Sequence, residues 1–317
     1  MNFPHSSLRF NALVRTAAFV CAGTLFAAAA LADAPTAGSS YPAFQVKIVG
    51  EGRPIVMIPG LASSGATWDA TSAELAGNHF RCIQLTLAGF AGVPPIQGSL
   101  LTQARDQIAQ YIRENHLDRP VIMGHSLGGS VALDLATHYP GLVGPVIIVD
   151  SLPFFAGAWF QVDSLAAAQP AIDKMRTGMA SMTADQWQAM TRSGASTNSM
   201  ATADKDKKTL IEWGLASDQK TVTNAMIELV GTDLRPDLGK IESPVLVLGT
   251  WIGLQAYGVT EEAVTQTFHD QYKNVKDLTF AMSKQSRHFV MWDDPAWFNT
   301  QISSFLASHA GAPVSTR

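Results

Sequence analysis

A single serine stands between glycines in the run Gly124-His125-Ser126-Leu127-Gly128-Gly129. Residues 120–123 before it have the composition of a buried strand, and residues 130–138 after it favour a helix. A tight strand-to-helix turn at a serine needs small neighbours, because it leaves no room for adjacent Cβ atoms. The pattern predicts a nucleophile elbow, with the Ser126 hydroxyl in a cleft at the positive end of the helix.

Length and composition limit the class of protein. The chain has 317 residues, 47% of them hydrophobic and 15% charged, which supports a sizeable core and argues against disorder. No basic run or arginine stripe is interleaved with aromatics, so we expect no nucleic-acid partner. The histidines lack ligand spacing and no phosphate-cradling loop is visible, so we predict neither a metal nor a nucleotide cofactor.

The N-terminus has the pattern of a secretory signal. Arg9 and Arg15 give a positively charged region before a continuous apolar run over residues 17–31, and Ala30-Leu31-Ala32 fits the small-x-small cleavage rule. A membrane anchor is the competing interpretation, but the run is short for a span. We expect cleavage after Ala32, no stable membrane anchor afterwards, and a mature protein that is secreted or periplasmic. Cys82 would then be the only thiol, which excludes an intrachain disulfide.

Seven short apolar or β-branched runs follow. They lie at residues 44–49, 54–58, 80–85, 120–123, 145–149, 245–248 and 278–281. Several are apolar throughout, as expected for strands covered on both faces. Helical patterns lie between them, the clearest at residues 100–115. This alternation predicts a doubly wound, mostly parallel α/β sheet.

One interval breaks the alternation. Roughly ninety residues separate Asp150 from Pro244, and they carry helical patterns but no convincing strand. We therefore predict a helical cap inserted between two strands. The expected organisation is a signal peptide (1–32), a flexible leader (33–43), a first core part (44–151), the cap (152–240), a second core part (241–307) and a flexible tail (308–317).

The start of the predicted cap is strongly aromatic. It contains Phe154, Phe155, Trp159 and Phe160. Such side chains line many small-molecule sites, so we predict contacts to substrate here. Packing within the cap is the alternative.

A serine nucleophile needs a base and an oxyanion site. His288 follows the last predicted strand and precedes a helix near Pro295, which places it at the carboxyl edge of the sheet. We predict it to be the base; His125, inside the elbow, should point away from the serine. The predicted oxyanion donors are two backbone N–H groups. One belongs to Leu127, directly after the serine, and the other to Leu61, in the glycine-containing loop after residues 54–58. An ordinary strand-to-helix turn is the alternative for Leu61.

These segments resemble the α/β-hydrolases with a cap, over residues 44–307. The segments that carry the resemblance are Pro59-Gly60-Leu61 with Trp68, residues 87–92, residues 124–129, Val149-Asp150-Ser151, and His288 before Asp294-Pro295. The resemblance implies a serine–histidine–acid triad on a doubly wound sheet. Two positions depart from the family pattern: Pro59 stands where histidine is frequent, and Thr86 where aspartate is frequent.

The third member of the triad is not found at the family's usual position. The family most often carries its acid just after the strand that follows the cap, and here residues 248–254 contain no carboxylate. Some members carry it at the end of the strand before the cap, which is Asp150 here. We predict Asp150 as the acid, with Glu261 and Glu262 as alternatives. Asp293 and Asp294 are expected to cap the final helix.

The predicted function is a secreted or periplasmic serine hydrolase that cleaves small-molecule carboxylic esters through an acyl-enzyme. A lactone, thioester or amide substrate, or cofactor-free haloperoxidase activity, would use the same residues. A noncatalytic ligand-binding protein on this fold is the alternative from another class.

Overall fold

The computed structural model describes residues 41–309, which form a seven-stranded sheet in the order β1-β3-β2-β4-β5-β6-β7. The strands are β1 (Phe44–Val49), β2 (Arg53–Ile58), β3 (Phe80–Leu87), β4 (Val121–His125), β5 (Val146–Val149), β6 (Val245–Gly249) and β7 (Leu278–Met282). All neighbours pair in parallel except the edge strand β1, which runs antiparallel to β3. The predicted fold class is confirmed.

Some sequence predictions lie outside the described residues. These are the signal peptide, most of the leader and nearly all of the tail. The end of the predicted leader is packed rather than free: Ala43 is fully buried, and its N–H donates to Gln107 Oε1 at 2.8 Å. This segment therefore continues directly into the edge strand β1.

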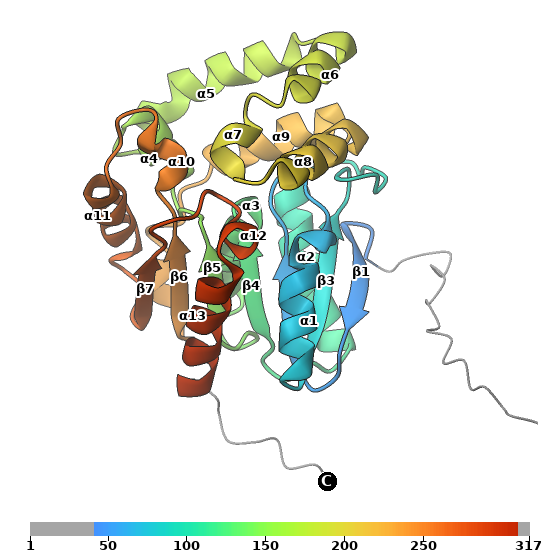
Figure 1. The fold of residues 1–317 in the computed structure, drawn as a ribbon, viewed down its shortest axis with the longest axis vertical. Helices are drawn as coiled ribbons and strands as arrows, with labels where there is room; N and C mark the ends of the chain where they lie inside the picture. Colours follow the sequence, from blue (N-terminus) through green and yellow to red (C-terminus); the bar gives the residue numbers. More distant parts are fainter. Residues whose placement is uncertain (1–40, 310–317) are drawn as a thin grey trace, which may run out of the picture. The chain divides into compact units, whose positions relative to one another are not determined.

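Helices cover both faces of the sheet (Figure 1). Outside the segment between β5 and β6 they are α1 (Asp69–Gly77), α2 (Leu100–Glu114), α3 (Leu127–His138), α10 (Ile252–Gln255), α11 (Glu261–Tyr272), α12 (Val290–Asp293) and α13 (Pro295–Ser308). Alternate residues of β2 enter different cores: Val56 and Ile58 pack with α2 and α3, whereas Ile55 and Met57 pack with α1 and α13. Burial on both faces explains why the central strands are apolar throughout.

The segment between β5 and β6 is helical, and we call residues 152–240 the inserted segment. Its helices are α4 (Phe155–Phe160), α5 (Leu165–Ala180), α6 (Ala184–Ser193), α7 (Thr197–Met200), α8 (Asp204–Ala216) and α9 (Gln219–Val230). Figure 1 shows α5 to α9 grouped beyond one end of the sheet. The helices α4 and α7 are only one to two turns long, which is too short to show a helical periodicity in the sequence.

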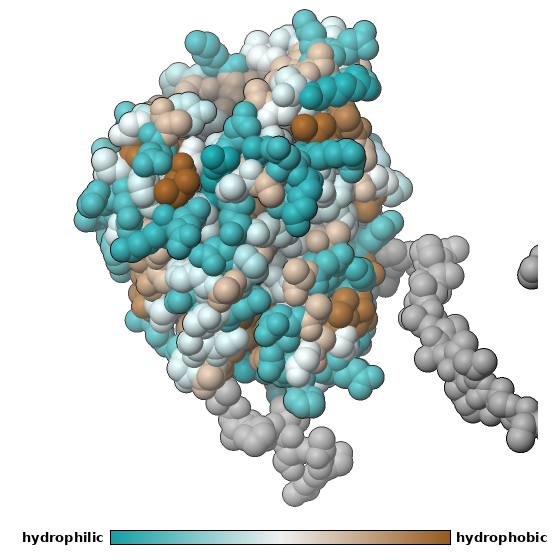
Figure 2. Space-filling view, in the orientation of Figure 1, coloured by the Kyte–Doolittle hydropathy of each residue, from teal (hydrophilic) through white to brown (hydrophobic). Residues whose placement is uncertain are grey.

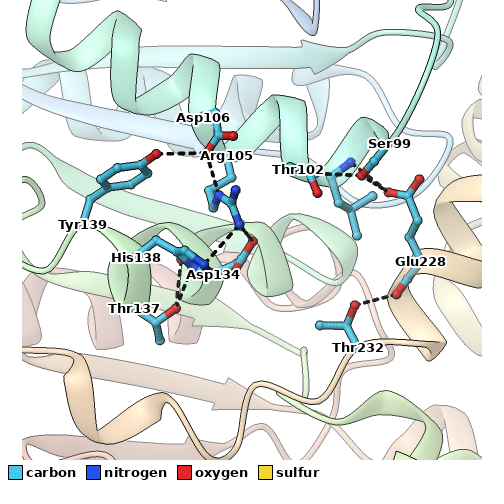
Figure 3. A network of polar contacts seen from close by, with 11 residues as sticks. Ser99, Thr102, Arg105, Asp106, Asp134, Thr137, His138, Tyr139, Glu228 and Thr232 are labelled. Carbon is cyan, nitrogen blue, oxygen red and sulfur yellow. Dashed lines mark hydrogen bonds and ion pairs between the residues drawn. The ribbon is translucent and has the colours of Figure 1, made fainter.

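Polar contacts hold the inserted segment against the sheet domain. Glu228 on α9 accepts hydrogen bonds from the Ser99 hydroxyl (3.0 Å) and the Leu101 N–H (3.1 Å), so its carboxylate occupies the N-terminus of α2. Figure 3 shows this contact beside the Arg105–Asp134 ion pair, which joins α2 to α3. The C-terminal part of α9 is thereby fixed to the helix layer that carries the elbow.

The surface is mostly hydrophilic on the face shown in Figure 2, with small separate apolar patches. Over residues 41–309, no helix combines the length and apolarity needed to cross a membrane.

Candidate active site

Ser126 occupies the sharp turn between β4 and α3. Its φ of 54° and ψ of −122° are strained for a residue with a side chain. A Cβ at Gly124 would lie 2.2 Å from the Gly128 carbonyl oxygen, and a Cβ at Gly128 would lie 2.3 Å from the Ile58 oxygen. Only glycine fits either position, so the close packing of α3 on β2 and β4 imposes the turn. Ser126 is partly exposed, whereas residues 121–125 and 127–130 on either side of it are buried.

Asp150 and His288 are brought together although 138 residues separate them. The His288 Nδ1 lies 2.6 Å from Asp150 Oδ2, and both side chains are largely buried. An Nδ1–H that donates to this carboxylate leaves the lone pair on Nε2, as a general base requires. Asp150 follows β5, which pairs with β4 so that Val149 lies opposite His125. Asp150 and Ser126 therefore follow adjacent strands at the same sheet edge.

Thr250 completes the surroundings of the acid. Its N–H donates to Asp150 Oδ1 at 2.9 Å and its hydroxyl to Oδ2 at 2.7 Å. These two hydrogen bonds fix the orientation of the Asp150 carboxylate. Thr250 was not predicted, since nothing in the local sequence around it marks a contact with a residue 100 positions earlier. Glu261 and Glu262 lie in the first turn of α11, where acids are favoured by the helix dipole.

His125 lies fully buried beneath the site. Its Nε2 lies 3.0 Å from the His288 carbonyl oxygen, and the two rings lie 4.4 Å apart. Burial, and then the nearby His288, hold the pKa of His125 well below its usual value. A neutral ring that donates from Nε2 satisfies this contact, whereas Nδ1 is buried and has no hydrogen-bond partner among residues 41–309. His125 therefore contacts the backbone of His288 rather than its Nδ1 or Nε2, which agrees with the prediction that it points away from the serine.

The two predicted oxyanion donors lie on either side of the elbow. Leu127 begins α3, and a Cβ at Gly60, the residue before Leu61, would lie 3.2 Å from Ser126 Cβ. Neither the Leu61 nor the Leu127 N–H has an acceptor within residues 41–309. Thr86, one of the departures from the family pattern, accepts from the Gly65 N–H at 2.8 Å and so helps hold the Leu61 loop.

The Ser126 hydroxyl makes no hydrogen bond within the part of the chain that the structure describes. Contacts between a nucleophile and its base are often long without substrate and tighten in the reactive complex. The structure therefore pairs His288 with Asp150, as the sequence predicts for a base and its acid, and it shows no hydrogen bond from Ser126 to His288 among residues 41–309.

The aromatic residues predicted to contact substrate occupy different environments. Phe154 is fully buried inside the inserted segment, and the Arg235 guanidinium lies 4.1 Å from the centre of its ring. Phe155 is partly buried and packs edge-on against Trp159, which is 49% exposed and stacks on Phe160. Packing accounts for Phe154, and Phe155 and Phe160 also pack against buried clusters, so Trp159 is the only exposed member of these four residues.

The two aspartates after His288 have different roles. Asp294 caps α13 as expected, accepting from the Trp297 N–H at 3.2 Å. Asp293 does not cap this helix; its carboxylate binds Thr202 in the inserted segment and the Arg287 N–H. Over residues 41–309, no group of three or more histidine, cysteine, aspartate or glutamate side chains is arranged to hold a metal ion.

Comparison with known proteins places this geometry in a family. Residues 55–301 match the model of the alpha/beta hydrolase family, which is most of the described chain. The chain belongs to this family. The resemblance inferred from the elbow and the loops around it is therefore confirmed, and so is membership of a family of hydrolases.

Individual relatives are distant. This alpha/beta hydrolase is 25% identical to a pimeloyl-[acyl-carrier protein] methyl ester esterase of Aliivibrio fischeri, over 82% of this chain and 96% of that protein. Among solved structures, an esterase from Exiguobacterium antarcticum superposes with a TM-score of 0.68 at 18% identity, covering 83% of this chain and 95% of that one. An enol-lactonase from Burkholderia xenovorans gives 0.66 at 17% identity, covering 83% and 96%. These two structures share the fold.

Proposed function

We propose that this protein is a serine hydrolase that cleaves carboxylic esters through an acyl-enzyme intermediate. The observation that carries the proposal is the 2.6 Å contact between His288 and Asp150 at the sheet edge where Ser126 forms its elbow. In the proposed reaction His288 Nε2 takes the Ser126 proton as the hydroxyl attacks the acyl carbon. The Leu61 and Leu127 N–H groups stabilise the oxyanion, and His288 then protonates the departing alcohol.

The inserted segment supports a small-molecule acyl substrate. It leaves β5 directly after Asp150 and contributes partly exposed aromatic side chains, so we propose that it caps an apolar acyl site. The esterase relative favours esters as the substrate class. A lactone is the second candidate, because the enol-lactonase shares this fold and a lactone is itself an ester closed into a ring.

The test is a panel of p-nitrophenyl esters from acetate to palmitate, with methyl esters and lactones alongside. The wild-type protein should turn over at least one ester and be labelled by a fluorophosphonate, and Ser126→Ala should lose both properties. Ser304→Ala, which removes an exposed hydroxyl on α13, is the matched control and should retain both. Labelling that persists in Ser126→Ala would move the nucleophile elsewhere.

We further propose that the mature enzyme is secreted or periplasmic, on the basis of the apolar run and the Ala30-Leu31-Ala32 site. Expression of the full chain and N-terminal sequencing of the product test this. A mature N-terminus at Asp33 is expected, and an intact Met1 in the membrane fraction would favour an anchor instead.

A further inference from the structure

Asp293, the last residue of α12, joins the inserted segment to the loop of the base. Its Oδ1 accepts from the Thr202 N–H at 2.9 Å, and its Oδ2 accepts from the Thr202 hydroxyl at 2.9 Å. The same Oδ2 accepts from the Arg287 N–H at 2.9 Å. Thr202 lies between α7 and α8, and Arg287 directly precedes His288. The Asp293 carboxylate therefore connects Thr202 in the inserted segment with Arg287 in the loop before α12, which are far apart in the sequence.

Two more hydrogen bonds reinforce this connection. The Phe289 N–H donates to the Met200 carbonyl at 2.9 Å, and Arg287 Nη1 donates to the Ala201 carbonyl at 3.0 Å. The residues on both sides of His288 are thus bonded to residues 200–202. A shift of residues 200–202 would be transmitted to the backbone of the base.

The Asp293 contact repeats the arrangement around Asp150. Each carboxylate accepts the N–H and the hydroxyl of a single threonine, and each accepts a third hydrogen bond from the His288 loop. Asp150 fixes the His288 side chain to the sheet. Asp293 instead fixes the backbone N–H of Arg287, the residue before His288, to the inserted segment. Hydrogen bonds to a charged acceptor are stronger than neutral ones, so both contacts restrain the loop.

We propose that Asp293 is a positioning residue. Through it, the position of His288 depends on the contact of residues 200–202 with the loop that carries His288. The inference rests on the proposed function, since it takes His288 to be the general base. A base must be held within about 0.5 Å of its working position. The Asp293 carboxylate supplies that restraint in addition to Asp150, and the loop is correctly placed only while the inserted segment is in contact with it.

Asp293→Asn tests the proposal directly. The amide keeps the size of the side chain but turns one acceptor oxygen into an NH₂ donor. This donor then faces other donors, which are the N–H and hydroxyl of Thr202 and the N–H of Arg287. Because misplacing a catalytic group by about 1 Å can cost up to 100-fold in rate, we expect kcat to fall by about 10- to 100-fold with KM changed by less than about twofold. Asp294→Asn is the matched control: it removes the same charge one residue later but keeps an oxygen that accepts the Trp297 N–H at the cap of α13, so it should spare kcat.

The partner in the inserted segment is tested with Thr202→Val and Thr202→Ser. Thr202→Val removes one of the three donors and should lower kcat by about 3- to 10-fold, and Thr202→Ser should restore it. If Thr202 acts through Asp293, the double variant Asp293→Asn/Thr202→Val should lose no more activity than Asp293→Asn alone. Multiplied losses would overturn the coupling, as would an Asp293→Asn variant with wild-type kcat and a lowered Tm.

A readout that needs no substrate separates this inference from the proposed function. The proton shared by His288 Nδ1 and Asp150 should give a downfield imidazole resonance in the proton NMR spectrum, which Asp150→Asn removes. Asp293→Asn should shift or broaden this resonance, whereas Asp294→Asn should not. If the wild-type protein hydrolyses no ester, the proposed function fails, but the resonance still decides whether Asp293 positions His288; an unchanged resonance in Asp293→Asn overturns it.

Discussion

Asp150 and Thr250 are joined by two hydrogen bonds, one from the threonine N–H and one from its hydroxyl. Thr250 stands directly after β6, in the place where the family most often carries its acid, and Asp150 stands after the neighbouring strand β5. The residue at the usual acid position is therefore a hydrogen-bond donor to the carboxylate at the other position. This relationship explains how residues 248–254 can lack a carboxylate while the histidine still has an acidic partner.

Asp150→Asn should lower kcat by about 10³- to 10⁴-fold, because an amide no longer holds His288 with its proton on Nδ1. Thr250→Val removes only one donor to the carboxylate and should cost about 3- to 10-fold. Steady-state kinetics on the best p-nitrophenyl ester measure both. Glu261→Gln and Glu262→Gln are the controls, since these acids lie at the start of α11; a large loss in either variant, with Asp150→Asn active, would reassign the acid.

The sequence predicted those parts of the molecule that have a local cause. The strands are short apolar runs and Ser126 lies in a five-residue pattern, so neighbouring residues were sufficient to find them. The resemblance, and a strand expected next to that of the serine, favour Asp150 over Glu261 from the sequence, but the contact with His288 itself depends on how two strands and a loop meet. Thr250 and Asp293 act across about 90 to 100 residues through hydrogen bonds that leave no periodicity in the sequence.

His125→Gln should change how stability depends on pH. The native state keeps His125 neutral, since its pKa is lowered well below 6.5, whereas the unfolded chain binds a proton near pH 6.5. The unfolded state binds more protons below that pH, so this group contributes stability at neutral pH that is lost on acidification. The contribution is fully present above about pH 6.5 and declines as the pH falls toward the lowered native pKa.

Urea unfolding of wild type and His125→Gln at about pH 5, 6, 7 and 8 measures this. The glutamine side chain of the variant cannot be protonated, so the variant should be less stable at the highest pH, and the difference in unfolding free energy should shrink toward the lowest. A difference that stays constant over this range would show that His125 does not titrate on unfolding.

Tyr272→Phe should destabilise the fold at the turn that carries the acid. The Tyr272 hydroxyl is buried and donates to the Ser151 carbonyl at 2.7 Å, and burial raises its pKa well above the usual value, with the Asp150 charge adding to the effect. Losing this donor leaves a buried carbonyl unsatisfied, which should cost about 1 to 3 kcal/mol of unfolding free energy. Tyr257→Phe, at a residue that is 76% exposed, should be neutral in the same urea titration. Equal effects in the two variants would contradict the assigned role.

Gly128→Ala should disrupt the elbow more than any ordinary glycine substitution. The new Cβ would lie 2.3 Å from the Ile58 oxygen and 2.5 Å from the Pro59 oxygen, and both are backbone atoms that cannot swing aside. Relief requires α3 to move away from β2, which separates Ser126 and the Leu127 N–H from the Leu61 loop. We expect a loss of at least about 3 kcal/mol in stability and of nearly all ester hydrolysis.

Gly141→Ala is the control, because nothing lies within 4 Å of its Cβ position. A stable, active Gly128→Ala enzyme would mean that α3 can shift without opening the site, and that the close contact of α3 with β2 does not set the geometry of the nucleophile.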